Sequence, residues 1–338
     1  MNKSNKMLFT IILLMSVPIS ISSNSWFIVW MGMEINMMAF IPIIMEQKNP
    51  MSKESSLTYF MMQTIASMLL MMSFMFMMLN NNKINFNMNS MGEMLLMSSL
   101  MIKSGMAPFH FWMPKMMEGL NWNKCLILMT WQKITPLMMM SNIIKINFIT
   151  LMAMMMSVII GAIGGLNQTS LRKMMAYSSI NNNGWMMAAM LMSETMWMTY
   201  YIMYSLMSTI MTLSMNMYNN YHINQIISMN ETPIKKLLLM INMLSISGLP
   251  PMLGFMPKWM VIQSTMFMNE FMLLGLLVIM TLITIYFYLR IMFSIMLLSF
   301  NEQKWNILSL NKNNNKIMLM NLLSIMGLLM ITLMMMLY

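Results

Sequence analysis

The sequence has very little cysteine and histidine, and this shortage excludes several kinds of site. Cys125 is the only cysteine, so the chain cannot hold a disulfide framework. His110 and His222 are the only histidines, which leaves too few ligands for a convincing metal or haem site. Any redox chemistry linked to this protein is therefore expected on another chain.

Charge is equally scarce. Charged residues make up 8% of the 338 residues, against roughly 25% in soluble domains. Hydrophobic residues make up 59%, more than a soluble fold of this length can cover. The net charge of +10 comes from basic residues scattered singly, which argues against a nucleic-acid-binding patch. The composition predicts an all-α polytopic membrane protein surrounded by the lipid bilayer.

Methionine is abundant, with 66 residues. It is an adaptable filler at helix contacts, but here it follows no preferred helix face. We favour a genetic cause, an AT-rich genome that reads an extra codon as methionine, as in animal mitochondria. Lys3 and Lys6 precede an apolar run as in a signal peptide, but without a small-residue cleavage site, so we expect a retained first helix.

The apolar runs have the length of transmembrane helices. A bilayer core of about 30 Å needs roughly 20 apolar residues per helix. The sequence predicts one domain over residues 1–338, with repeat halves at 1–141 and 146–298 and a C-terminal helix. The eleven expected spans are 7–23, 25–45, 56–79, 91–112, 123–141, 146–166, 171–191, 195–216, 236–267, 271–298 and 317–337.

Basic residues are distributed unequally between the two sets of connecting segments. Thirteen fall on one face, while only Lys83 and Lys145 fall on the other. Lys and Arg concentrate in cytoplasmic-type loops. The N-terminus is therefore expected on the cytoplasm-equivalent side, which is the matrix in a mitochondrion. One missed helix would scramble this alternation, so the bias also supports eleven spans.

A short segment occurs twice. Residues 104–115 align without gaps on residues 247–258, with serine, glycine, two prolines, methionine and lysine in register. Proline removes an amide donor, so Pro108, Pro250 and Pro251 are expected to break the fourth and ninth helices. The offset of five spans makes the repeat inverted, and such paired interruptions mark a transport path. The alternative is two independent proline kinks, which are common in membrane helices.

Several ionisable residues lie deep inside predicted spans. Glu34, Lys103 and Lys133 each lie roughly 14–18 Å from the start of their helix. A lone charge there costs about 2.5–3.5 kcal/mol on insertion scales, so these groups must be paired, hydrated or partly neutral. Lys258 is as deep only if residues 256–267 re-enter the bilayer core. Lys115 is expected at the surface.

We interpret these buried charges as a proton relay in which Glu34 balances Lys103. The alternative, salt bridges that only hold helices together, is weaker because buried ion pairs rarely add net stability over apolar packing. Arg290 lies near a span end and is expected to snorkel. The predicted relay residues are Glu34, Lys103, Lys133 and Lys258.

Polar side chains accompany these charges. Within a span they either hydrogen-bond between helices or hold a file of water, and their clustering in the seventh span favours water. His110 is suited to proton transfer near neutral pH, although a histidine beside aromatics is as often an interfacial residue. The supporting polar residues are His110, Gln132, Tyr177, Ser178 and Asn182.

Five motifs together resemble the NADH–ubiquinone oxidoreductase chain 2 family of animal mitochondria, in order and over nearly the whole chain. They are WMGMEIN (30–36), KSGMAPFHFW (103–112), WQKITP (131–136), SLRKMMAYSSIN (170–181) and GLPPMLGF (248–255).

The resemblance implies an antiporter-like, proton-pumping subunit in the membrane arm of respiratory complex I, in the mitochondrial inner membrane. It assigns the family's glutamate to Glu34 and its lysines to Lys103, Lys133 and Lys258. It implies other membrane-arm subunits as partners. NADH, FMN, iron–sulfur clusters and ubiquinone would be used by other subunits, with no cofactor bound here. Asn182 stands where the family has histidine, which puts a titratable role for the seventh span in doubt.

Two other interpretations remain open. A free-standing cation/proton antiporter shares the inverted repeat, and activity of the isolated chain would favour it. A purely structural subunit would seal the membrane arm without carrying protons. Normal proton stoichiometry after replacement of all four in-span charges would select this second interpretation.

Overall fold

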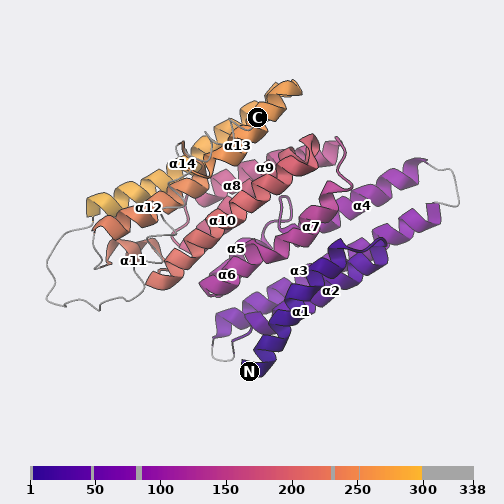
Figure 1. Cartoon of the computed structure of the whole chain (residues 1–338), viewed down its shortest axis with the longest axis horizontal. Helices are drawn as coiled ribbons and strands as arrows, with labels where there is room; N and C mark the ends of the chain where they lie inside the picture. The colour runs from indigo at the N-terminus through magenta and orange to yellow at the C-terminus, as the bar shows by residue number, and fades with distance from the viewer. Residues whose placement is uncertain (1–2, 47–48, 81–85, 230–232, 251, 299–338) are drawn as a thin grey trace. The chain divides into compact units, whose positions relative to one another are not determined.

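The computed structural model describes residues 3–46, 49–80, 86–229, 233–250 and 252–298, and these are almost entirely helical (Figure 1). The predicted eleventh span, 317–337, lies outside the described residues. The helices are α1 (Lys3–Ile21), α2 (Trp26–Ile44), α3 (Pro50–Asn80), α4 (Phe86–Ser104), α5 (Trp112–Gly119), α6 (Trp122–Met129), α7 (Trp131–Ser141), α8 (Phe148–Gly165), α9 (Leu171–Met192), α10 (Glu194–Tyr218), α11 (Ile223–Ile227), α12 (Pro233–Ser247), α13 (Phe255–Phe267) and α14 (Phe271–Leu298).

The chain has an all-helical membrane fold. Five helices in the described part of the chain are long and apolar enough to cross a bilayer: α1, α2, α3, α8 and α14. Helices α9 and α10, with 22 and 25 residues, coincide with the predicted seventh and eighth spans. Their polar and aromatic residues lower the hydropathy, and most of these side chains are buried inside the protein.

Helix α3 has an apolar exposed face and a polar buried face. This polarity is the reverse of a soluble helix and is the arrangement that a helix facing lipid requires. The exposed stripe is Leu57, Met61, Ile65, Met68, Met72 and Met75. The buried polar residues are Ser52, Ser55, Ser56, Gln63, Ser67 and Ser73.

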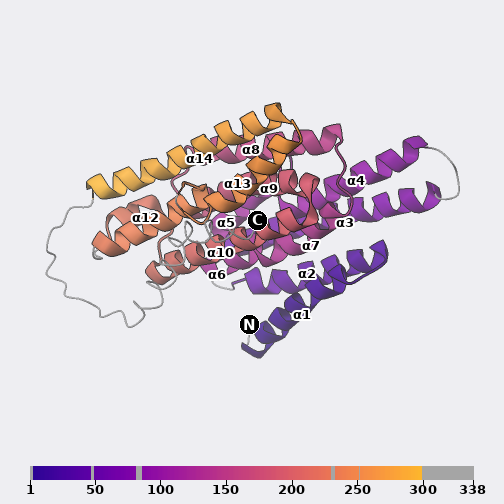
Figure 2. The same cartoon turned by 45° about the horizontal axis from the view of Figure 1, so that its top comes forward.

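The helices form two compact units that divide within α8, Met1–Met156 and Ser157–Tyr338. In the first unit, α3 packs on α2, α4 and α5, while α7 packs on α1, α4 and α6 (Figures 1 and 2). In the second unit, α13 packs on α9, α10 and α14, and α12 packs on α10 and α14. The predicted repeat halves, 1–141 and 146–298, stay a prediction.

Both copies of the repeated segment separate two helices at the same register. Helix α4 ends at Ser104 and α5 begins at Trp112, and α12 ends at Ser247 and α13 begins at Phe255. The ends of α4 and α12 are therefore 143 residues apart, and so are the starts of α5 and α13. The seven residues between the helices have the same span in the two units.

Glycine, and not proline, ends both helices. Gly105 and Gly248 have φ angles of 71° and 82°, in the left-handed region that glycine adopts without strain. Each is the centre of a Schellman motif, with matching backbone hydrogen bonds from residues 105 and 106 to Ile102 and Met101, and from 248 and 249 to Ser245 and Leu244. Pro108 and Pro250 follow after the helices have already ended, where they prevent the helix from continuing.

The fifth predicted span, 123–141, is interrupted at Thr130, which the sequence analysis did not expect. Thr130 lies between α6 and α7 with φ −107° and ψ −78°. Its hydroxyl donates a 2.8 Å hydrogen bond to the carbonyl of Leu126, four residues earlier. Such back-bonding competes with the helical ladder and bends helices. The interruption lies one turn before Lys133.

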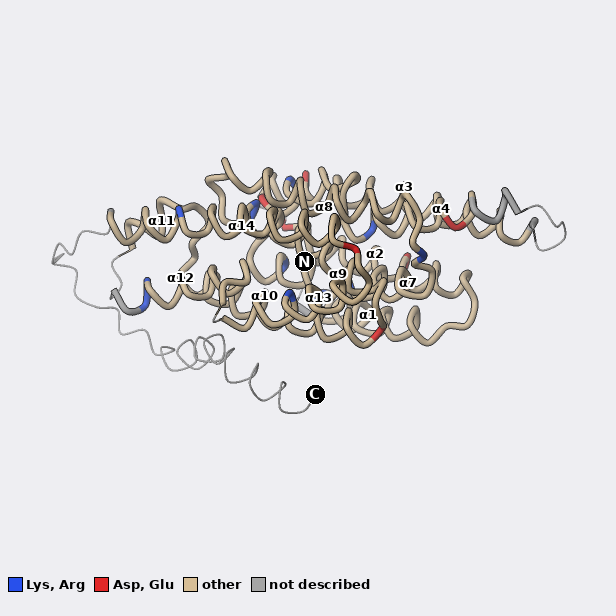
Figure 3. The backbone as a smooth tube through the Cα atoms, turned by 90° about the horizontal axis from the view of Figure 1, so that it is seen from above, with Lys and Arg blue, Asp and Glu red and all other residues tan. Residues whose placement is uncertain are grey.

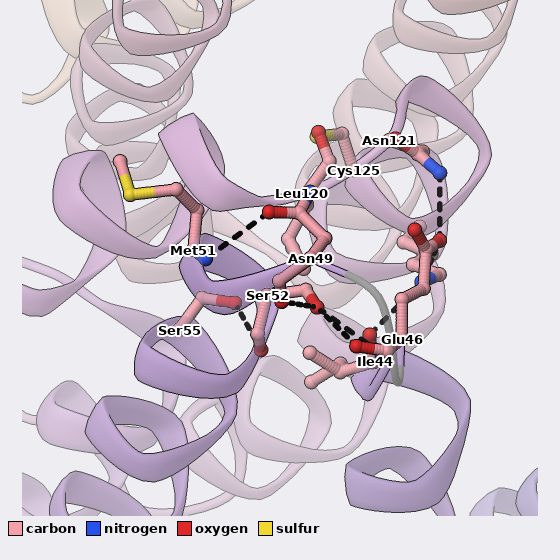
Figure 4. A network of polar contacts seen from close by, with 10 residues as sticks. Ile44, Glu46, Asn49, Met51, Ser52, Ser55, Leu120, Asn121 and Cys125 are labelled. Carbon is pink, nitrogen blue, oxygen red and sulfur yellow. Dashed lines mark hydrogen bonds and ion pairs between the residues drawn. The ribbon is translucent and has the colours of Figure 1, made fainter.

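Charged residues are few along the helices (Figure 3). Ion pairs join Glu46 to Lys124 and Glu93 to Lys145. Lys124 also donates a 2.9 Å hydrogen bond to the carbonyl of Ile44, and Asn121 donates one of 2.7 Å to Glu46 (Figure 4). This network fastens the start of α6 to the end of α2.

The same network reaches the start of α3. The hydroxyl of Ser52 donates to the carbonyl of Glu46 at 3.2 Å and accepts from the Glu46 amide at 3.1 Å (Figure 4). Gly119, the last residue of α5, also lies against α3, because a Cβ there would be 2.6 Å from the carbonyl oxygen of Met51. The network thereby joins the end of α2 to the starts of α3 and α6, and the end of α5 packs on the start of α3.

Candidate functional site

A buried cavity in the first unit brings two of the predicted lysines together. It lies between α2, α3, α4, α5, α6 and α7, and gives about 20 Å³ of space to the centres of water molecules. One water needs roughly 10–15 Å³ on this measure, so the cavity has room for a single water. Its polar lining includes Asn36, Tyr59, Gln63, Lys103, Gln132 and Lys133.

Lys103 lies in the last turn of α4, one residue before the helix ends. The helix dipole favours a positive charge at this end. Its ammonium group contacts Sδ of Met33 at 3.3 Å. Glu34, the next residue on α2, is partly buried and acts on Lys103 electrostatically. Within the described residues the two side chains make no direct ion pair.

Lys133 lies on α7 and is only 2% exposed. Its backbone amide donates to the carbonyl of Thr130, where α6 and α7 meet. Lys133 and Lys103 come from helices that pack on each other and both line the cavity. Two ammonium groups on one small cavity would repel each other strongly in a medium of low dielectric.

A string of neutral hydrogen bonds crosses the lining of the cavity. The hydroxyl of Tyr59 donates to Oε1 of Gln132 at 3.2 Å, and Nε2 of Gln132 donates to Oδ1 of Asn36 at 3.1 Å. Gln63 donates at 3.4 Å to the carbonyl of Lys103, near the end of α4. Three helices, α2, α3 and α7, are joined in this way at the level of the lysines.

Sequence reasoning named Gln132 as a supporting residue but missed Tyr59 and Gln63. A signal for both was present. They are four residues apart on α3, so they share a helix face, and that face carries the buried polar residues of an otherwise apolar helix. Both residues lie outside the sequence motifs that suggested the site. The Tyr59–Gln132 hydrogen bond joins residues that are 73 positions apart, so the sequence did not indicate that they are in contact.

Lys258, in the second unit, lies in the first turn of α13 and is 5% exposed. Its ammonium group donates a 2.7 Å hydrogen bond to the carbonyl of Ser247, the last residue of α12. It also lies 5.8 Å from the ring centroid of Trp185 on α9. Its repeat partner Lys115 is exposed, as predicted. In the first unit a different side chain bonds to the end of the preceding helix. The indole of Trp112 donates a 3.1 Å hydrogen bond to the carbonyl of Ile102, near the end of α4.

The remaining predicted side chains have separate surroundings. Asn182 accepts a 3.0 Å hydrogen bond from the hydroxyl of Tyr200, and Ser178 donates to the carbonyl of Met175 in its own helix. Tyr177 packs on Gly164, where an added Cβ would be 2.4 Å from its ring.

His110 is buried, and its Nδ1 lies 3.2 Å from the carbonyl of Pro108 in the turn before α5. Its ring centroid is 4.2 Å from that of Phe111. Arg290 is exposed and donates to the carbonyl of Leu166, as expected of a residue near a span end. Within the described residues no group of three or more His, Cys, Asp or Glu side chains is placed to hold a metal ion.

These features define a class: a helical membrane protein that holds ionisable side chains between its helices. The family described as NADH:quinone oxidoreductase/Mrp antiporter transmembrane matches residues 23–284. NADH-ubiquinone oxidoreductase chain 2 of Anopheles gambiae is 46% identical, over 98% of each chain. The chain 2 protein of Aedes aegypti is 48% identical, also over 98% of each. This chain belongs to the NADH–ubiquinone oxidoreductase chain 2 family.

Solved structures share the fold at low sequence identity. A chain of respiratory complex I from Thermus thermophilus with bound aureothin has a TM-score of 0.84 and 18% identity, over 96% of this chain and 78% of that one. A chain of the Mrp complex from Dietzia sp. DQ12-45-1b has a TM-score of 0.74 and 12% identity, over 84% of this chain and 59% of that one.

Proposed function

We propose that this chain is a proton-translocating subunit in the membrane arm of respiratory complex I. Its neighbours there are other membrane-arm subunits and lipid. Quinone reduction elsewhere in the complex supplies the energy. The observation that carries the proposal is that Lys103 and Lys133, from two different helices, line one buried cavity with room for a water.

The relay begins with Lys103, whose positive charge Glu34 and the end of α4 stabilise. Lys133 accepts the proton across the cavity. Because two positive charges at this cavity repel each other, a second proton arriving at Lys103 favours departure of the first from Lys133. A change in the distance between Glu34 and Lys103 alters the affinity of the lysine for its proton, which couples transfer to motion elsewhere.

Lys258 releases the proton in the last step of the relay. The Lys258 ammonium group donates a hydrogen bond to the carbonyl of Ser247. The end of α12 therefore stabilises the charge of Lys258, as Glu34 stabilises the charge of Lys103. His110 and the polar residues of α9, Tyr177, Ser178 and Asn182, support the path through water. Asn182 does not titrate, so at this position the seventh span contributes a hydrogen bond and no proton carrier.

The eleven spans form an inverted repeat in the mitochondrial inner membrane, with the fourth and ninth spans interrupted and the N-terminus on the matrix side. The matching Schellman motifs at Gly105 and Gly248 support the repeat. The unequal distribution of Lys and Arg supports the orientation. The chain binds no cofactor, and NADH, FMN, iron–sulfur clusters and ubiquinone belong to other subunits.

The test replaces Lys103 or Glu34 by alanine in the complete complex, reconstituted into vesicles. Both variants should assemble, as judged by native gels, and should lose proton pumping more than assembly. Unchanged pumping in an assembled complex would remove these residues from the path. A second candidate function is a free-standing cation/proton antiporter, which the fold shared with an Mrp chain supports. Exchange of cations for protons across vesicles by the purified chain alone would favour this function.

A further inference from the structure

Tyr59 places a phenol at the cavity that Lys103 and Lys133 share. Its side chain is 3% exposed, and it lines the cavity together with both lysines. We propose that the Tyr59 hydroxyl is the group that passes the proton between the two lysines. The inference rests on the proposed function, because it concerns a step between Lys103 and Lys133.

The other polar groups of the lining are less suited to this step. Amides accept and donate hydrogen bonds but do not readily pass a proton on, which excludes Asn36 and Gln132 as carriers. The hydroxyl of Ser104 donates at 3.2 Å to the carbonyl of Met101 in its own helix. Thr135 is an aliphatic alcohol, and a phenol gives up its proton more readily.

The observed hydrogen bonds hold the Tyr59 hydroxyl in a closed position. Its hydrogen points at Oε1 of Gln132, and Gln132 is fixed by its own bond to Asn36. Rotation about the C–O bond redirects this hydrogen into the cavity without moving the ring. The hydroxyl thus has two positions, one bound to Gln132 and one connected to the cavity water.

In the open position the transfer balances without any electron transfer. The Lys103 ammonium gives a proton to the cavity water, and that water gives one to the Tyr59 oxygen. Tyr59 gives its own hydrogen to the neutral Lys133 amine. Lys103 ends as an amine and Lys133 as an ammonium, while the water and Tyr59 keep their hydrogen counts.

Packing fixes the Tyr59 ring independently of its hydroxyl. The ring makes an edge contact with Phe40, with centroids 5.3 Å apart, and lies 6.0 Å from the ring of Trp112. Phenylalanine keeps both contacts, so Tyr59→Phe should fold and assemble. Tyr286→Phe is the control, since Tyr286 on α14 is 59% exposed and does not line the cavity.

The experiment measures protons moved per NADH oxidised, and both rates, for complexes reconstituted into vesicles. Tyr59→Phe should reduce the ratio or, where pumping and turnover are strictly coupled, reduce both rates by about tenfold or more. Tyr286→Phe should pump like the parent. Parent-like ratio and rates in an assembled Tyr59→Phe complex would overturn the proposal.

Gln132→Leu separates a relay from a structural hydrogen bond. If the Tyr59–Gln132 hydrogen bond only holds α3 against α7, Gln132→Leu and Tyr59→Phe should reduce pumping equally. Equal losses would therefore count against the relay. The relay predicts a smaller loss for Gln132→Leu, because the hydroxyl remains. Lys133→Met tests the proposed function separately: if it loses pumping while Tyr59→Phe does not, only the inference about Tyr59 fails.

Discussion

The ammonium group of Lys258 is hydrogen-bonded, at 2.7 Å, to the carbonyl oxygen of Ser247 at the end of α12. The last carbonyls of a helix lack internal partners and carry the negative end of its dipole. In the described part of the chain no carboxylate pairs with Lys258. Ending α12 inside the protein therefore provides the acceptor that stabilises this buried charge.

Gly248→Ala tests this contact. A Cβ at Gly248 would be 2.9 Å from Cδ of Lys258, whereas one at Gly105 would first meet Sδ of Met113 at 3.1 Å. Both glycines have positive φ, so both substitutions share a backbone cost of roughly 1–2 kcal/mol. At equal assembly, Gly248→Ala should lose more proton pumping than Gly105→Ala. Parent-like pumping by an assembled Gly248→Ala complex would show that the Lys258–Ser247 contact is not needed.

Close packing of α8 on α9 gives a second prediction. A Cβ at Gly161 would be 2.6 Å from the backbone nitrogen of Asn181, which cannot move aside. Overpacking of this kind costs about 1–3 kcal/mol, so Gly161→Ala should lower the yield of assembled complex on native gels. Gly275→Ala is the control, since an added Cβ there meets nothing within 4 Å. Equal yields would mean that α8 and α9 separate easily.

The Glu46–Lys124 and Glu93–Lys145 ion pairs should differ in their contribution to stability. The Lys124 side chain is 13% exposed and that of Lys145 is 61% exposed. Exposed pairs contribute about 0–1 kcal/mol, whereas Lys124 also holds the carbonyl of Ile44. Lys124→Met should therefore shorten the half-life of the complex at raised temperature, and Lys145→Met should have little effect. The reverse order would contradict the bracing role of the network at the start of α6.

Asn182 gives a prediction about the residue that departs from the family. It accepts a hydrogen bond from Tyr200, whose side chain is 2% exposed. Asn182→Leu leaves that hydroxyl without this acceptor, at a cost of about 1–3 kcal/mol, so less complex should assemble. Asn182→His retains a possible acceptor and should assemble better than Asn182→Leu. Similar yields for the two variants would mean that the hydrogen bond contributes little.

Helix positions were predictable because lipid imposes a simple rule on length and composition. The helices α1, α2, α8, α9 and α14 fall within a few residues of the predicted spans. The separation of α4 from α5 was also visible in the repeat, but the cause was not. Left-handed glycine ends each helix ahead of the prolines, and a φ angle cannot be read from a motif.

The candidate site was predictable in its charges and not in its neutral contacts. Lys103 and Lys133 are conspicuous because charge is rare in an apolar span. Whether Glu34 touches Lys103 depends on the rotation of α2 against α4, which sequence does not give. Tyr59 was missed because hydroxyls are common in membrane helices, and only packing of α3 near α7 gives this one a partner.

Proton transfer between Lys103 and Lys133 depends on water in the cavity that they share. The most direct measurement is an experimental map of the complete complex at a resolution that resolves ordered solvent. We predict at least one water in the cavity, within hydrogen-bond distance of Tyr59 and of one of the two lysines. A dry cavity filled by side chains, with the two ammonium groups sealed from each other, would contradict this prediction.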